Sequence, residues 1–151
     1  MSDTDLINLY SARILALAAD IPLTTRLENP AATVKRRSPL CGSTVTVDIM
    51  VEDGKISQFG QDVKACALGQ ASASIMAENI IGRTLDQVEH ARDQLSDMLK
   101  HAGTIPDAPF QGFEVLLPAR DFKNRHASIM LALQATVEAM TITQTETQQT
   151  S

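Results

Sequence analysis

The sequence has few aromatic residues, few cysteines and no excess of positive charge. Aromatic side chains make up 3% of the 151 residues and tryptophan is absent, so a surface on which nucleic-acid bases stack is not expected. The formal net charge of -5 provides no general positive field for phosphates, and the one cationic run, Lys35-Arg36-Arg37, is short. These features argue against a nucleic-acid-binding protein.

The sequence also lacks the long apolar segments that targeting and membrane insertion require. Its first residues include Asp3 and Asp5, whereas a signal peptide begins with positive charge. No apolar run approaches the roughly 20 residues that cross a bilayer. We therefore expect a cytoplasmic protein without a membrane segment, in which the two cysteines are more typical of thiols or metal ligands than of a structural disulfide.

What the sequence does contain predicts one domain with a small sheet. Apolar residues at helical spacing predict a first helix from Asp5 to Ala19, and a short edge strand is expected from Ala32 to Arg37. Residues 44–51 alternate between polar and apolar, which predicts a half-buried strand. Asp53-Gly54 then predicts a tight turn into an antiparallel partner strand over residues 55–63.

Smaller features refine the rest of the chain. Gly60 interrupts the second hairpin strand, so a β-bulge is expected there. A helix is expected after Cys66 with its end at Gly82, and Thr84 with Gln87 predicts a capping box for the next helix. The apolar stripe of that helix consists of Leu85, Val88, Ala91, Leu95, Met98 and Leu99.

The last third of the sequence completes an α+β fold. A proline-containing loop precedes a short turn of structure over Phe113 to Ala119, and a last long helix is expected from Lys123 to Met140. Residues 141–151 are rich in Thr and Gln and are expected to form a disordered tail. The prediction is a single domain over residues 1–140, with a three-stranded antiparallel sheet packed against an N-terminal helix and several C-terminal helices.

The two cysteines are candidate ligands at one end of this sheet. Cys41 lies as far before Asp53 as Cys66 lies after Gly54, so antiparallel pairing brings them towards the same end. Cys66 begins a helix and follows Lys64, which favours the thiolate. The alternative is that both cysteines are small core residues without a chemical role.

His126 is the third candidate ligand. It shares a helical face with apolar residues at offsets of three, four and seven: Ile129, Met130 and Leu133. The ring is therefore expected to point towards the core near the start of the last helix, where the helix dipole favours a neutral imidazole that can bind metal. The alternative is a partly buried histidine with an internal hydrogen bond. His90 and His101 are expected to face solvent.

Two thiolates and an imidazole suit Zn²⁺, or iron in a sulfide cluster, better than Mg²⁺ or Ca²⁺. Three protein ligands leave one coordination position open, which is typical of a site for exchange or transfer. A closed structural zinc site usually has four.

Several motifs together resemble the iron-sulfur cluster assembly scaffold family that includes IscU, SufU and the N-terminal domain of NifU. The resemblance covers roughly residues 3–140. Its motifs are Cys41-Gly42 before a strand, Val51-Glu52-Asp53-Gly54-Lys55-Ile56 at the hairpin, Cys66 followed by Ala71-Ser72-Ala73-Ser74, Pro118-Ala119-Arg120, and Arg125-His126-Ala127-Ser128-Ile129-Met130.

The resemblance implies a binding protein rather than an enzyme. Members of the family receive sulfur from a cysteine desulfurase, hold a labile [2Fe-2S] cluster or a zinc ion at the end of the sheet, and pass the product to acceptor proteins. It assigns the ligand positions to Cys41, Cys66 and, as in some members, His126. Either a monomer or a homodimer is compatible with this role.

Two positions depart from the family pattern. Ser43 stands where the family typically has aspartate, and Ala127 stands where it has a third cysteine. The sequence thus leaves two alternatives to a scaffold or scaffold-like accessory protein. One is a zinc-dependent sulfurtransferase partner that accepts persulfide from the desulfurase, and the other is a metal-free interaction domain.

Overall fold

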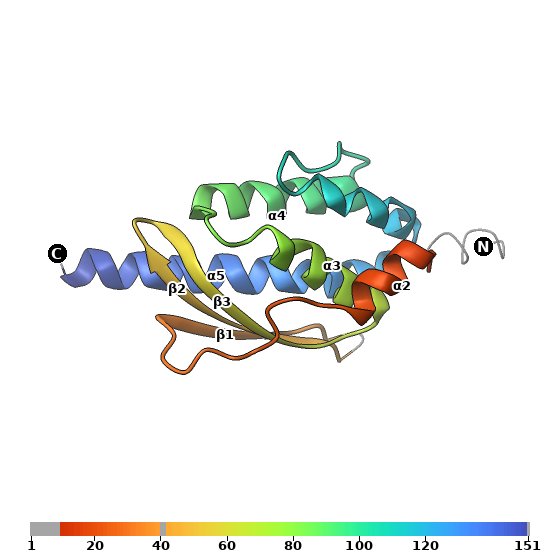
Figure 1. Cartoon of the computed structure of the whole chain (residues 1–151). Helices are drawn as coiled ribbons and strands as arrows, with labels where there is room; N and C mark the ends of the chain where they lie inside the picture. Colours follow the sequence, from red (N-terminus) through yellow and green to blue (C-terminus); the bar gives the residue numbers. More distant parts are fainter. Residues whose placement is uncertain (1–9, 40–41, 151) are drawn as a thin grey trace.

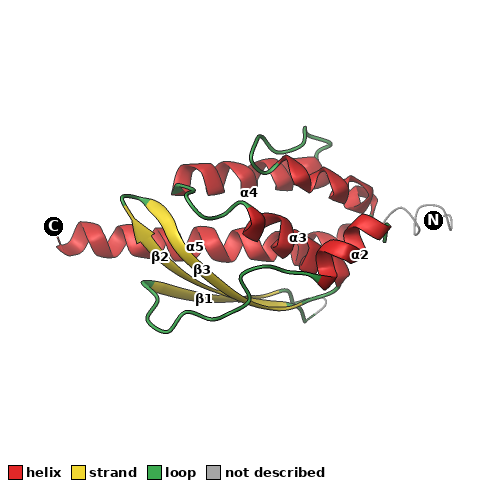
Figure 2. Ribbon diagram, in the orientation of Figure 1, coloured by secondary structure: helices red, strands yellow, loops and turns green. Residues whose placement is uncertain are grey.

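The computed structural model describes residues 10–39 and 42–150, with side chains described as far as residue 145. Its elements are α2 (Ala12–Ala19), β1 (Ala32–Arg37), β2 (Thr44–Glu52), β3 (Lys55–Lys64), α3 (Ala67–Glu78), α4 (Leu85–Lys100), the 3-10 helices η1 (Gln111–Asp121) and η2 (Lys123–Arg125), and α5 (His126–Thr150). The strands form one antiparallel sheet in the order β1-β2-β3. The predicted α+β fold is therefore confirmed (Figures 1 and 2).

The sheet is built by the alternation along β2. Val45, Val47 and Ile49 are fully buried on the face that the helices cover, because successive strand residues point to opposite faces. Asp53 and Gly54 both have positive φ, as a tight hairpin turn requires. The hairpin prediction is confirmed.

The bulge in this hairpin does not lie where the sequence predicted it. Pairing runs without a break through Gly60, which faces Asp48, and shifts between Met50 and Val51 instead. Gly60 has a different role: a Cβ there would collide with the carbonyl oxygen of Thr25 and press on the backbone of Leu27. Its missing side chain lets the loop after α2 lie directly on the sheet.

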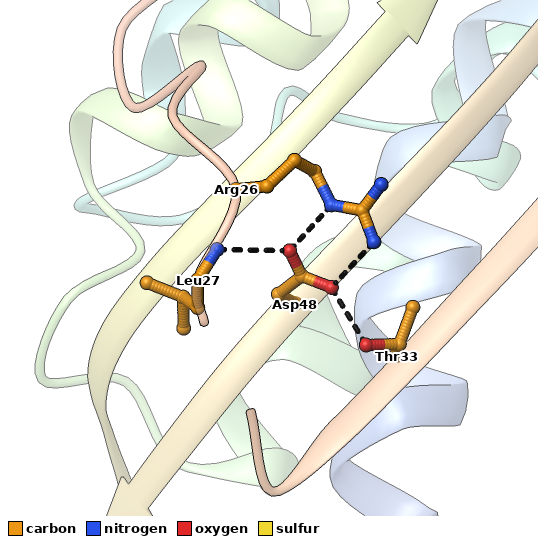
Figure 3. A network of polar contacts seen from close by, with 4 residues as sticks. All are labelled: Arg26, Leu27, Thr33 and Asp48. Carbon is orange, nitrogen blue, oxygen red and sulfur yellow. Dashed lines mark hydrogen bonds and ion pairs between the residues drawn. The ribbon is translucent and has the colours of Figure 1, made fainter. Parts of the chain in front are cut away.

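A buried carboxylate holds that loop in place (Figure 3). Asp48 is fully buried and accepts hydrogen bonds from Arg26 Nε (2.5 Å), Arg26 Nη2 (3.0 Å), the Leu27 N–H (3.1 Å) and Thr33 Oγ1 (2.6 Å). Burial by itself raises the pKa of this carboxyl, but the donors and the guanidinium charge outweigh it and hold the pKa below its usual value. The loop and β1 are thus tied to β2 through one side chain.

Helix α5 is the central helix of the fold. It packs against β1 and β2 on one side and against α3 and α4 on the other, while α2 packs on α3. Leu133, Ala135 and Ala139 are fully buried along it. Most of the apolar core therefore depends on this helix.

The predicted stripe and capping box of α4 are both present, with every stripe residue buried. Helix α3 ends earlier than predicted, at Glu78 instead of Gly82. The Asn79 N–H closes the last turn on the carbonyl oxygen of Met76, and Gly82 follows with a φ of +88. The predicted turn over residues 113–119 is part of the longer η1.

The end of α5 also differs from the prediction. The helix starts at His126 after the 3-10 turn η2 and continues through Thr150, where a disordered tail was expected after Met140. Thr141 and Thr145 donate from their hydroxyls to backbone carbonyl oxygens four residues earlier, and Thr143 is buried. These local bonds satisfy polar side chains inside a helix. None of the helices in the described part of the chain is long and apolar enough to span a bilayer.

Candidate functional site at the start of α3 and α5

Two of the three predicted ligands lie at the first residues of helices that pack together. Cys66 is the N-cap of α3 and is half-buried, and His126 is the first residue of α5 and is buried. Cys41 lies outside the described residues. His90 and His101 are exposed, as predicted.

A close helix contact brings the two helix starts together. A Cβ added to Gly69, in the first turn of α3, would lie 2.5 Å from Ser128 Oγ and 2.8 Å from the Cβ of Ala65. Real Cβ atoms are essentially never that close, so any larger residue would force Ser128 or Ala65 to shift. Farther along, Ser72 Oγ donates to the carbonyl oxygen of Ile129 at 2.6 Å. The small residues of α3 thus allow α5 to approach its backbone.

Three polar side chains meet at this contact. Cys66 Sγ lies 3.4 Å from Ser128 Oγ, and the Ser128 hydroxyl donates to Ser43 Oγ at 3.1 Å. Ser43 directly precedes β2, and both serines are almost fully buried. These two contacts therefore bring together the start of β2, the start of α3 and the start of α5.

Described residues on either side of positions 40–41 are held beside the same contact. The N–H of Ser38 donates to the carbonyl oxygen of Ser43 at 2.8 Å, and the N–H of Gly42 donates to that of Ser38 at 3.0 Å. Gly42 has a φ of +70, a conformation that glycine adopts at little cost. Ser38, Gly42 and Ser43 are thus linked by backbone hydrogen bonds.

His126 is held by one ring nitrogen. Its Nε2 lies 2.9 Å from the carbonyl oxygen of Ala119, and because a carbonyl oxygen only accepts, Nε2 carries the hydrogen. In the neutral ring Nδ1 is then the unprotonated nitrogen. The internal hydrogen bond that the alternative interpretation predicts is present.

The described residues alone do not form a complete metal site. Among the described side chains, those of residues 10–39 and 42–145, no group of three His, Cys, Asp or Glu is placed to hold an ion. Cys66 is a free thiol that contacts the hydroxyl of Ser128. The three-ligand site, which includes Cys41, stays a prediction.

Sequence reasoning did not assign a role to Ser128. The residue is part of the motif that begins at Arg125, but serine is a common helix residue and nothing in its spacing marks a contact with Cys66. The detectable signal was Gly69: a glycine inside a helix is unfavourable by about 1 kcal/mol and indicates a close backbone approach.

Comparison with known proteins identifies the family. Residues 20–114 match the family model described as the NifU-like N terminal domain. The chain belongs to this family. The resemblance indicated by the cysteine and histidine motifs is thereby confirmed, and it places the chain among the IscU, SufU and NifU N-terminal scaffolds.

Individual members of the family agree with this assignment. A nitrogen-fixing NifU-like protein (N-terminal) from Brucella abortus has a crystal structure that matches with a TM-score of 0.91 at 41% identity, covering 93% of this chain and 97% of that one. The iron-sulfur cluster assembly scaffold protein IscU of Thermotoga maritima is 22% identical over 132 residues, which is 87% of this chain and 92% of the relative.

A further structure supports the fold alone. The putative iron-sulfur cluster assembly scaffold protein for the SUF system from Fervidobacterium islandicum AW-1 matches with a TM-score of 0.78 at 20% identity, covering 89% of this chain and 98% of that one. The family fold is therefore shared even where the sequences have diverged.

Proposed function

We propose that this chain is an iron-sulfur cluster assembly scaffold that holds a [2Fe-2S] cluster or a single iron ion through Cys41, Cys66 and His126. The observation that carries the proposal is the position of Cys66, at the meeting point of the starts of α3 and α5. Family membership supports it, since IscU of Thermotoga maritima is named a cluster assembly scaffold.

Cys66 has the surroundings of a metal-binding thiol. As the N-cap of α3 it lies where the backbone N–H groups of the first helical turn point, and metal binds cysteine as the thiolate. It is half-buried, so part of the residue is open to an incoming ion. Thiolate sulfur is the ligand preferred by iron-sulfur clusters and is also suited to zinc.

His126 supplies a nitrogen ligand in this proposal. Metal-binding histidines usually donate their other ring N–H to a carboxylate or a carbonyl oxygen, which fixes the tautomer. The hydrogen bond from Nε2 to Ala119 is of this type. It leaves Nδ1 as the candidate ligand atom.

Cys41 completes the set by chain connectivity. It precedes Ser43 by two residues in the sequence, and two residues of chain span at most about 7 Å. Ser43 contacts Ser128, which contacts Cys66. This proximity along the chain supports Cys41 as the second thiolate ligand.

Three protein ligands leave part of the cluster's coordination to another donor. Ser43 and Ala127 offer a hydroxyl and a methyl group where typical members have a carboxylate and a thiol, and neither is a comparable ligand. An open position suits a carrier that takes sulfur from a cysteine desulfurase and passes its cargo to acceptor proteins. In this role the chain acts in the cytoplasm as a monomer or a homodimer and has no catalytic residue of its own.

Anaerobic reconstitution with iron and sulfide tests the proposal. The wild-type protein is expected to give a coloured species with iron and sulfide bound in stoichiometric amounts. Cys66→Ser is expected to lose it without loss of helix α3, because serine is a favoured N-cap residue. Circular dichroism of the same sample checks that the fold is retained.

Histidine variants provide the matched control. His126→Gln is expected to weaken cluster retention while keeping a donor towards Ala119, and His101→Gln changes an exposed histidine and is expected to have no effect. A wild-type protein that takes up only colourless zinc would favour the sulfurtransferase partner. If it binds neither metal, the scaffold proposal is wrong and the metal-free domain is favoured.

A further inference from the structure

The start of α5 also borders a cavity, whose lining includes His126 and Ala127 of the candidate metal site. The cavity has a volume of about 570 Å³ and is bounded by the end of β1, the last residue of α4 and the first nine residues of α5. Its lining includes the basic residues Arg36, Arg37, Lys100 and Lys123. No acidic side chain of the described residues lines it.

The positive charge of this cavity is largely uncompensated. Arg36 lies 3.5 Å from Glu138, whereas Arg37, Lys100 and Lys123 have no ion-pair partner within residues 10–39 and 42–145. The whole chain has a net charge of -5, so this concentration of cations does not follow from composition. The positive end of the α5 dipole adds to it.

Part of the cavity lining is apolar, and we call this part the floor. It consists of Met130 and Leu131, which are buried residues of α5, and the half-buried Ala127, beside the polar Ser38 and Gln134. The volume of the cavity is within the range of small-molecule sites, which combine apolar walls with a few polar groups. Cations above an apolar floor match a ligand that has both anionic groups and an apolar part.

We propose that this cavity binds a small organic anion that carries carboxylate or phosphate groups. Arg37, Lys100 and Lys123 bind the anionic groups, and the organic part lies over Met130 and Leu131. The buried ring of His126 forms part of the wall, so the ligand is placed next to the candidate metal site. The inference does not require metal or cluster binding.

Titrations of the metal-free protein followed by amide NMR shifts test this proposal. The probes are phenyl phosphate, citrate and inorganic phosphate at constant ionic strength. Phenyl phosphate and citrate are expected to bind with shifts confined to residues 36–39, 100 and 123–134, and inorganic phosphate is expected to bind more weakly because it cannot use the apolar floor. The response to phenyl phosphate and to citrate separates a phosphate ligand from a carboxylate ligand.

Charge variants give the decisive comparison. Lys100→Gln combined with Lys123→Gln is expected to weaken binding at least about tenfold, since charge-assisted hydrogen bonds are the strong contacts of such a site. Arg13→Gln combined with Lys55→Gln removes the same charge from exposed residues elsewhere and is expected to leave binding unchanged.

Three results would overturn the proposal. The first is no shift with any probe at millimolar concentration, and the second is equal weakening by both double variants, which would indicate general charge attraction. The third is binding of an acidic peptide such as hexaglutamate when none of the small probes binds, because this surface would then take a macromolecular partner.

Discussion

Asp48 is a buried charge whose function is structural. It accepts four hydrogen bonds from three residues, and its ion pair with Arg26 is half exposed at the arginine. Replacement by asparagine keeps the shape but removes the charge and turns one acceptor into a donor. We expect Asp48→Asn to lower the free energy of unfolding at pH 7 by about 2 kcal/mol, measured by urea denaturation.

The loss of stability in Asp48→Asn should become smaller as the pH falls. The pKa of Asp48 is lower in the folded protein than its usual value, so the carboxylate stabilises the fold fully above its unfolded pKa and less as the pH falls through its folded pKa. The difference between wild type and Asp48→Asn should therefore shrink between about pH 5 and pH 2. A constant difference would contradict the charge argument. Asp121→Asn, at an exposed aspartate, is the control.

Ala127 offers a direct test of the ligand assignment. The residue lies between His126 and Ser128 and is half-buried, so a cysteine there adds a thiol beside the candidate site. We expect Ala127→Cys to increase cluster yield and retention after reconstitution, because a cluster prefers four protein ligands. Thr141→Cys places a thiol on an exposed position of the same helix and should give no increase. An unchanged yield in Ala127→Cys would contradict the assignment.

The sequence predicted the burial and the helix position of single residues better than it predicted which residues they contact. The burial of His126 and the helix start at Cys66 followed from local spacing, and both were predicted. The contacts of Ser128 with Cys66 and Ser43 join residues more than 60 positions apart. Such contacts depend on how the helices dock, and no local pattern records them.

At the scale of elements, the contact between α3 and α5 sets the geometry of the site. Alanine is usually favoured over glycine inside a helix by about 1 kcal/mol. At Gly69 this gain is not expected, because the added methyl group would overlap with Ser128 and Ala65. We expect Gly69→Ala to destabilise the protein by about 1–3 kcal/mol and to reduce cluster retention because Ser128 is displaced. Thermal unfolding and reconstitution measure the two effects.

Gly112→Ala is the matched control for Gly69→Ala. A Cβ at Gly112 lies 3.4 Å from Cγ2 of Ile75, which is ordinary contact. This variant should be close to neutral in both measurements. If Gly69→Ala is equally neutral, the approach of α5 to α3 is not limited by this residue.

Elements with a strong local signal were predicted well, and those decided by packing were not. The β2-β3 hairpin and α4 have turn and cap residues that act locally. The end of α5 was misjudged because a Thr- and Gln-rich segment has little helical preference of its own. There the threonine hydroxyls donate hydrogen bonds to backbone carbonyl oxygens of the same helix and support its continuation. The amino-acid composition of the segment does not predict these bonds.

At the scale of the whole molecule, we expect α5 to make the fold one cooperative unit. It contacts β1, β2, α3 and α4, so neither the sheet nor the other helices can keep their apolar faces covered without it. The chain has one tyrosine, Tyr10, which packs against the core near α2. The fluorescence of Tyr10 therefore reports on the region near α2, whereas far-UV circular dichroism reports on the secondary structure of the whole chain.

Leu133→Ala tests this cooperativity. Leu133 is fully buried in the first half of α5, and its truncation should lower the free energy of unfolding by about 3 kcal/mol. Because the unit is cooperative, the transitions measured by tyrosine fluorescence and by circular dichroism should shift together. Ile142→Ala, at a partly exposed position of the same helix, should change stability much less. Separate transitions in Leu133→Ala would mean that α2 and α3 unfold independently of α5, and the site between α3 and α5 would then open without global unfolding.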